Sequence, residues 1–151
     1  MDPFSITASV ASLLSFSGSC AKDLRKLIHT ARSAPTEILA LTNELADLNI
    51  LLADLNNTSQ AIERAPIRSQ ADGDFLIALA VQLGKAESKL TQLHSLASTF
   101  STRATDGSIK FQRYKWLRNK SSAIKVQREL AEVRQSLGLL FASNTAYVFL
   151  C

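Results

Sequence analysis

Apolar residues recur at intervals of three and four along most of the chain, the spacing of one face of an α-helix. The regularity is clearest in four segments. Their apolar positions are Ile6, Val10, Leu13, Leu14, Ala21, Leu24, Leu27 and Ile28; Ile38, Leu41, Leu45, Leu48, Leu52 and Leu55; Leu76, Leu79, Leu83, Ala86, Leu90, Leu93, Ala97 and Phe100; and Val126, Leu130, Val133, Leu137 and Leu140. No segment alternates with a period of two, so the pattern predicts four amphipathic helices and no strand.

Narrow apolar stripes of this kind are typical of helices that cross at shallow angles in a bundle. The first two segments are closely linked and should lie antiparallel, whereas the links within 59–73 and 106–121 are longer. We expect Asp72 or Asp74 to cap the third helix, and Ser121 or Ser122 the fourth. The prediction is an all-α, up-down bundle of four main helices with long second and third connections, forming a single domain over residues 1–151.

The first segment has no charge between residues 3 and 21, where seven of the residues are Ser or Thr. Asp2 stands where an export signal carries basic residues, and the hydroxyls interrupt any continuous apolar run, so the stretch is not a signal peptide. It is also too polar to insert alone as a transmembrane span. Gly18 predicts a kink or a local weakness. We therefore expect a soluble, cytoplasmic protein.

On a helix, the serines of this segment form one small, hydroxylated stripe: Ser5, Ser9, Ser12, Ser15 and Ser19. One interpretation is a core helix whose outer face carries Ser in place of Lys or Glu. The other is a segment suited to both water and lipid, because its outer face is polar but uncharged. The apolar end of the chain, "AYVFLC", either packs on the bundle or indicates that the natural protein continues past residue 151.

Charge is segregated along the chain although the net charge is only +4. All charges between 33 and 63 are acidic, and all charges between 107 and 128 are basic. Such segments are expected to pair with each other or with a charged surface. The basic stretch includes "KFQRYKWLRNK", where five cations alternate with Phe111, Tyr114 and Trp116. It could be a loop that plugs the bundle, a contact with an anionic membrane or partner, or a nucleic-acid site.

The sequence offers little chemistry. His29 and His94 stand alone, and Cys20 and Cys151 form neither a disulfide framework nor a metal-ligand spacing. Neither a phosphate-binding glycine loop nor a nucleophile elbow is present. We therefore expect no catalytic, metal or cofactor site, and the chain is predicted not to be an enzyme.

The string "MDPFSITASVASLL", the leucine-rich helix after it and the later "YKWLRNKSSAIKVQRELAEVRQSLGLLFA" resemble fungal HeLo-like and SesA-type domains. These are the N-terminal domains of fungal STAND (NOD-like) receptors and of related ankyrin-repeat proteins. The resemblance spans roughly residues 1–145. It implies a helical bundle that acts in programmed cell death, allorecognition and fungal innate immunity.

By this resemblance, a sensor domain later in the chain clusters the bundles, and the first helix is released to permeabilise the plasma membrane. The implied partners are further copies of the chain, anionic lipids and the sensor domain, with no nucleic acid. The membrane-active positions are Phe4, Ile6, Val10, Leu13, Leu14 and Phe16. The anionic-surface contacts are Lys110, Arg113, Lys115, Trp116, Arg118 and Lys120.

One departure from the family bears on this mechanism. Members with a glycine zipper carry Gly at four-residue spacing, where this chain has Ala11, Ser15 and Ser19. The competing hypothesis is therefore a protein-docking bundle, an adaptor with no membrane step.

Overall fold

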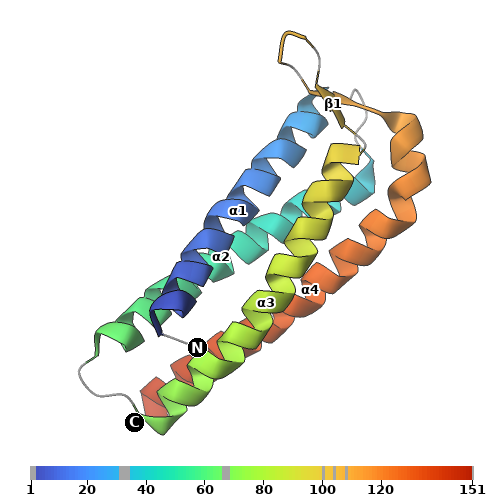
Figure 1. Ribbon diagram of the computed structural model, residues 1–151. Helices are drawn as coiled ribbons and strands as arrows, with labels where there is room; N and C mark the ends of the chain where they lie inside the picture. The colour runs from blue at the N-terminus through green and yellow to red at the C-terminus, as the bar shows by residue number, and fades with distance from the viewer. Residues whose placement is uncertain are drawn as a thin grey trace.

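The computed structural model describes residues 3–30, 35–65, 69–99, 101–103, 105–107 and 109–150, with backbone only at 3–5, 30, 103, 109 and 145–150. Four helices carry the fold: α1 (Pro3–Thr30), α2 (Thr36–Arg64), α3 (Gln70–Thr99) and α4 (Arg113–Leu150). They run alternately up and down, as Figure 1 shows. The predicted all-α bundle is confirmed.

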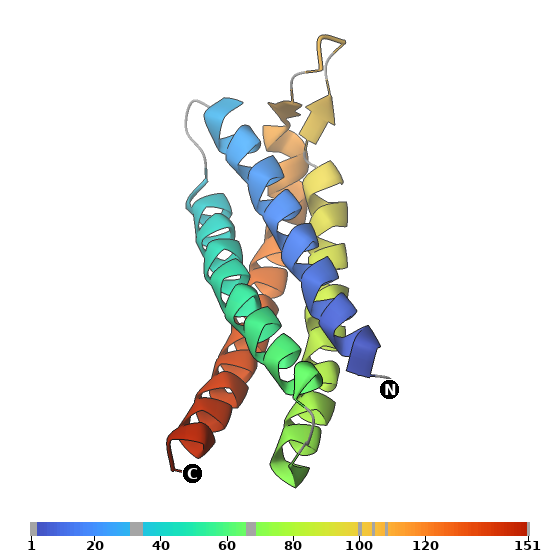
Figure 2. The same ribbon diagram turned by 90° about the vertical axis from the view of Figure 1, so that its left-hand side faces the viewer.

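The core is built from the apolar stripes that the sequence displays. Ile38, Leu41, Leu45, Leu48, Leu52 and Leu55 of α2 are each 1% exposed or less. The stripe of α3 is buried from Leu76 to Leu93, and that of α4 from Val126 to Leu137. Helix α1 packs mainly on α2 and α3, while α4 packs on the other side of the same two helices (Figure 2). Helices α1 and α4 therefore lie diagonally opposite each other in the bundle, and each packs on α2 and α3.

The first three helices differ from the prediction in the length of a link, in a cap and at Gly18. The second link is short, because α2 continues to Arg64 and α3 begins at Gln70. The cap of α3 is Ser69: its hydroxyl accepts a hydrogen bond from the Asp72 backbone N–H, and Asp72 accepts one from the Ser69 N–H. Neither Asp72 nor Asp74 is thus the cap itself. Helix α1 is continuous through Gly18.

The third link contains a β-hairpin, which corrects the expectation that the chain has no strand. Strands β1 (Ser101–Arg103) and β2 (Ile109–Phe111) pair antiparallel, with Ser101 opposite Phe111. Gly107 lies in the turn at φ +87°, a conformation that favours glycine. Helix α4 then begins at Arg113, not at Ser121 or Ser122. Strands of three residues are too short to display an alternating pattern.

Ion pairs join α4 to α2 and α3, and one of them, between Lys120 and Glu37, links the basic segment to the acidic one. Arg134 of α4 donates a hydrogen bond to Glu44 of α2, which is buried, and this raises the pKa of Arg134. Lys120 Nζ lies 3.1 Å from Glu37 Oε1. A third pair joins Lys89 of α3 to Glu129 of α4 and lowers the pKa of Glu129. These pairs tie α4 to both of its neighbours.

Candidate functional site

The inner face of α1 contributes to the core. Ile6, Val10 and Leu13 are 4%, 0% and 5% exposed. Leu14 and Phe16 are partly buried and pack against that core. The side chain of Phe4 lies outside the described residues. The predicted membrane-active positions with described side chains are thus covered fully or in part by the folded bundle.

The outer face of α1 is small and uncharged over its first five turns. Between Ile6 and Ala21, the exposed residues are Ala8, Ala11, Ser12, Ser15 and Ser19. Ser9 is half-buried, and the side chain of Ser5 lies outside the described part. By contrast, the exposed positions of α2 include Asp47 and Asp54, and those of α3 include Lys85 and Glu87. Three members of the hydroxylated stripe, Ser12, Ser15 and Ser19, are therefore exposed.

Two polar contacts tie α1 to α2. Asn49 of α2 donates from Nδ2 to the Leu14 carbonyl at 3.0 Å and to Ser17 Oγ at 2.9 Å. Ser17 is fully buried and donates in turn to the Leu14 carbonyl at 3.1 Å. Near the start of the helix, the Thr7 hydroxyl donates to Glu63. These bonds satisfy buried polar groups and fix the register of α1 on α2.

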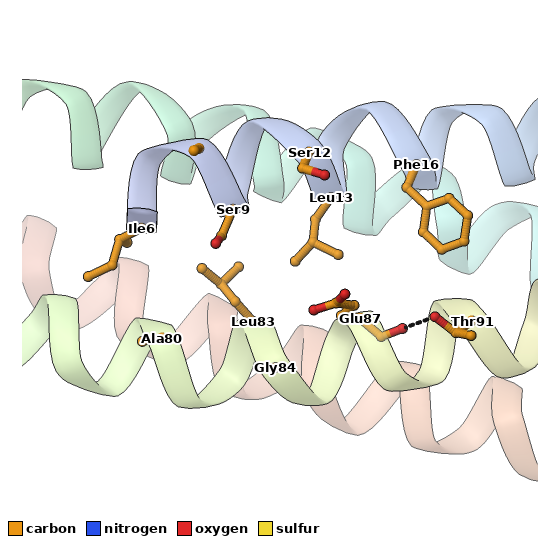
Figure 3. A pocket seen from close by; sticks show the side chains of 11 residues that line it. Ile6, Ser9, Ser12, Leu13, Phe16, Ala80, Leu83, Gly84, Glu87 and Thr91 are labelled. Atoms are coloured by element: carbon orange, nitrogen blue, oxygen red, sulfur yellow. Dashed lines mark hydrogen bonds between the residues drawn. The ribbon is translucent and has the colours of Figure 1, made fainter. Parts of the chain in front are cut away.

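The contact between α1 and α3 is less completely filled. A groove of about 660 Å³ runs between them. Figure 3 shows Leu13 and Leu83 pointing into it from opposite helices, with Ser9 beside them. Ala80 and Gly84 line its α3 side with little or no side chain. Helix α1 is therefore held tightly on one flank and loosely on the other.

The basic-aromatic stretch begins in β2 and is helical from Arg113 onward, and two of its predicted contact residues are not free to meet a surface. Trp116 is only 3% exposed and packs near Phe111, with ring centroids 6.2 Å apart. Lys120 is paired with Glu37, whose pKa is lowered by a backbone hydrogen bond and by this lysine. The assignment of Trp116 as a surface contact is therefore wrong, because the tryptophan plugs the end of the core.

The remaining predicted contacts, Lys110, Arg113, Lys115 and Arg118, are exposed. Two neighbours outside the predicted contact set, Tyr114 and Leu117, are 71% and 64% exposed. The helical spacing predicts their exposure if Trp116 is assigned to the core. Trp116 is followed at intervals of seven, three and four residues by the buried Ala123, Val126 and Leu130. That stripe places Tyr114 and Leu117 on the outer side of α4.

No catalytic arrangement emerges among the described residues. His29 and His94 are exposed, and His94 packs by its ring near Phe16 with centroids 5.8 Å apart. Burial and then the nearby Asp23 raise the pKa of Cys20 to about 11, so its thiol is protonated and unreactive at neutral pH. Within the described part, no three His, Cys, Asp or Glu residues form a group that could hold a metal. Cys151 lies outside it.

Comparison with known proteins identifies a family. The model of the family described as "Pigment biosynthesis cluster protein PigL N-terminal" matches residues 1–134. The chain belongs to this family. No curated protein and no solved structure matches the chain.

Membership of the PigL N-terminal family agrees with the broad expectation of a fungal helical domain. The narrower assignment to HeLo-like or SesA-type domains of STAND receptors stays a prediction. In the part of the chain that the structure describes, none of the helices combines the length and the apolar character needed to cross a bilayer.

Proposed function

We propose that this chain is a non-catalytic, cytoplasmic signalling bundle of a fungal immune-type receptor, which self-associates and delivers α1 to a membrane. The resemblance to HeLo-like domains supports the class of receptor, and the family supports a fungal helical domain. The observation that carries the mechanism is the uncharged outer face of α1, opposite an apolar inner face. Such a helix can be covered by protein on one side and meets no charge penalty in lipid on the other.

Release of α1 into water alone is too costly to occur spontaneously. Full burial of one large aliphatic side chain contributes roughly 1.5–3 kcal/mol, so exposing Ile6, Val10 and Leu13 costs about 5–9 kcal/mol. That is comparable with the whole stability of an ordinary domain, about 5–15 kcal/mol. A bilayer removes this cost because it covers the same apolar area. Clustering therefore acts by shifting a population toward a released state that lipid stabilises.

The experiment is vesicle leakage with a charge placed on the outer face of α1. Ser15→Glu changes an exposed residue and leaves the core intact. It adds about 2.5–3.5 kcal/mol to the free energy of inserting that position at the bilayer centre. We expect the leakage caused by this variant to be at least tenfold lower than that caused by the wild type. Ser88→Glu, the same change at an exposed position of α3, is the matched control and should leak like the wild type.

Both variants are first checked for a folded bundle by circular dichroism and by thermal unfolding. Equal leakage by Ser15→Glu, Ser88→Glu and the wild type would refute delivery of α1. Absence of leakage from an oligomeric wild type would refute it as well.

The second candidate is a docking bundle without a membrane step, and the bonds from Asn49 and Thr7 that hold α1 on α2 favour it. Its expected signature is a defined oligomer or complex in solution and indifference to lipid.

A further inference from the structure

Exposed cations from three separate parts of the sequence lie on elements that converge at one end of the bundle. The last turns of α1, strand β2 and the first turns of α4 all lie at the end that carries the hairpin (Figures 1 and 2). Strand β2 also contacts α1 directly. The exposed cations at this end are Lys22, Arg25, Lys26, Lys110, Arg113, Lys115 and Arg118. We call this set, with Tyr114 and Leu117, the basic end.

Few carboxylates oppose this charge. Among the described residues of the basic end, Asp23 is half-buried and Asp106 is exposed, while Glu37 already pairs with Lys120. The end therefore carries a local positive excess that the net charge of +4 for the whole chain conceals. The sequence alone does not group Lys110 with Lys22, Arg25 and Lys26, because more than 80 residues separate it from them.

Two large side chains project from the same end. Tyr114 and Leu117 are 71% and 64% exposed, although both occupy the helical turn that buries Trp116. Arg118 lies over the Tyr114 ring, 5.9 Å from its centroid. A tyrosine and a leucine surrounded by cations are the composition that membrane interfaces favour: the rings and methyl groups enter the headgroup layer while the cations meet lipid phosphates.

We propose that the basic end docks the folded bundle onto an anionic phospholipid surface. Docking needs no release of α1, so it stands independently of the mechanism proposed above. Membrane is favoured over nucleic acid because the two other aromatics of the stretch are not available to stack on bases. Trp116 is buried, and Phe111 packs against the core. An exposed leucine does not contribute to recognition of nucleic-acid phosphates, whereas it can enter a lipid surface.

The test is cosedimentation with phosphatidylcholine vesicles that contain or lack phosphatidylserine. We expect binding only to the vesicles with phosphatidylserine, and loss of that binding at high salt. The triple variant Arg113→Gln/Lys115→Gln/Arg118→Gln should bind at least tenfold more weakly, since each cation near an anionic surface contributes about a fivefold effect. Tyr114→Ser/Leu117→Ser should also weaken binding at least tenfold.

Matched controls change exposed residues of the same types elsewhere. Lys85→Gln/Arg64→Gln/Arg128→Gln removes three cations outside the basic end, and Ile77→Ser/Val81→Ser removes two exposed apolar side chains of α3. Both should bind like the wild type. The proposal is overturned if the controls lose as much binding as the test variants, if the wild type ignores phosphatidylserine, or if a DNA duplex competes the protein off the vesicles.

The experiments distinguish a failure of the docking proposal from a failure of the proposed delivery of α1. Ser15→Glu should still bind vesicles while it loses leakage, because residue 15 lies outside the basic end. A protein that binds through the basic end without causing leakage would retain the docking proposal and refute delivery of α1.

Discussion

At the scale of single residues, Asn49 is the main polar link between α1 and α2. Its amide donates both to the Leu14 carbonyl and to the buried Ser17 hydroxyl. Both acceptors are in α1, so this one side chain fixes how the helix sits on its neighbour. Any process that moves α1 away must first break these bonds.

We predict that Asn49→Ala lowers the free energy of unfolding by about 1–3 kcal/mol, because it removes two hydrogen bonds and leaves Ser17 with one partner fewer in the core. Asn57→Ala, which changes an exposed asparagine of the same helix, is the control and should stay within about 0.5 kcal/mol of the wild type. Urea denaturation of the two variants measures the difference. Equal midpoints would show that the link contributes nothing.

Gly18 lies beside Asn49 and offers a change in the opposite direction. A Cβ at this position would be 3.5 Å from Asn49 Nδ2, an ordinary contact. We expect Gly18→Ala to raise the melting temperature, because alanine in a helix interior is favoured over glycine by about 0.5–1 kcal/mol. Gly107→Ala should instead lower it, since the φ of +87° strains any residue with a Cβ. A fall in the melting temperature of Gly18→Ala would indicate crowding at the contact.

At the scale of elements, α4 is held by ion pairs as well as by its apolar stripe. Lys89 and Lys120 lower the pKa values of Glu129 and Glu37 respectively, and Glu37 is affected even more by a backbone hydrogen bond. A carboxylate whose pKa is lower in the folded than in the unfolded chain contributes stability above the unfolded pKa. That contribution disappears as the pH falls through the folded pKa.

The contribution of these two carboxylates to the stability of the bundle should therefore be constant above about pH 4.5 and decrease below it. Glu129→Gln should flatten the decrease, because it removes one of the two responsible groups. Glu132→Gln, at an exposed position one turn further along α4, should leave the profile as steep as in the wild type. Urea midpoints measured across the acidic range distinguish these outcomes, and identical profiles for all three proteins would contradict the assignment.

The sequence was sufficient to predict those elements whose apolar stripe is long. The apolar stripe of α2 recurs through six positions, from Ile38 to Leu55, and the structure buries all six. The hairpin was missed because each strand has three residues. The start of α4 was missed because cations around Trp116 resemble a loop, although the tryptophan begins the stripe that continues at Ala123.

The candidate sites depend more on tertiary structure. The inner face of α1 was readable from spacing alone, since Ile6, Val10 and Leu13 repeat every three or four residues. The basic end was readable only in part, because it is assembled from α1, β2 and α4. Which cations are already paired, as Lys120 is, depends on where a distant carboxylate lies in space.

At the scale of the whole molecule, the two proposed membrane contacts lie at different places. The basic end lies on elements at the end of the bundle that carries the hairpin, whereas the uncharged first turns of α1 lie toward the opposite end (Figures 1 and 2). A bundle that is docked by its basic end and still folded therefore keeps the start of α1 away from the bilayer. Delivery of α1 requires that this helix leave α2 and α3.

The most direct measurement uses an environment-sensitive dye on the outer face of α1. The dye is attached to Ser12→Cys, an exposed position, after the native thiols are removed by Cys20→Ala and Cys151→Ser. When the protein binds vesicles containing phosphatidylserine, we predict a blue shift from this dye and none from the same dye at Ser88→Cys of α3. Bound protein in which the dye at residue 12 shows no shift, or shifts no more than the dye at residue 88, would contradict the release of α1.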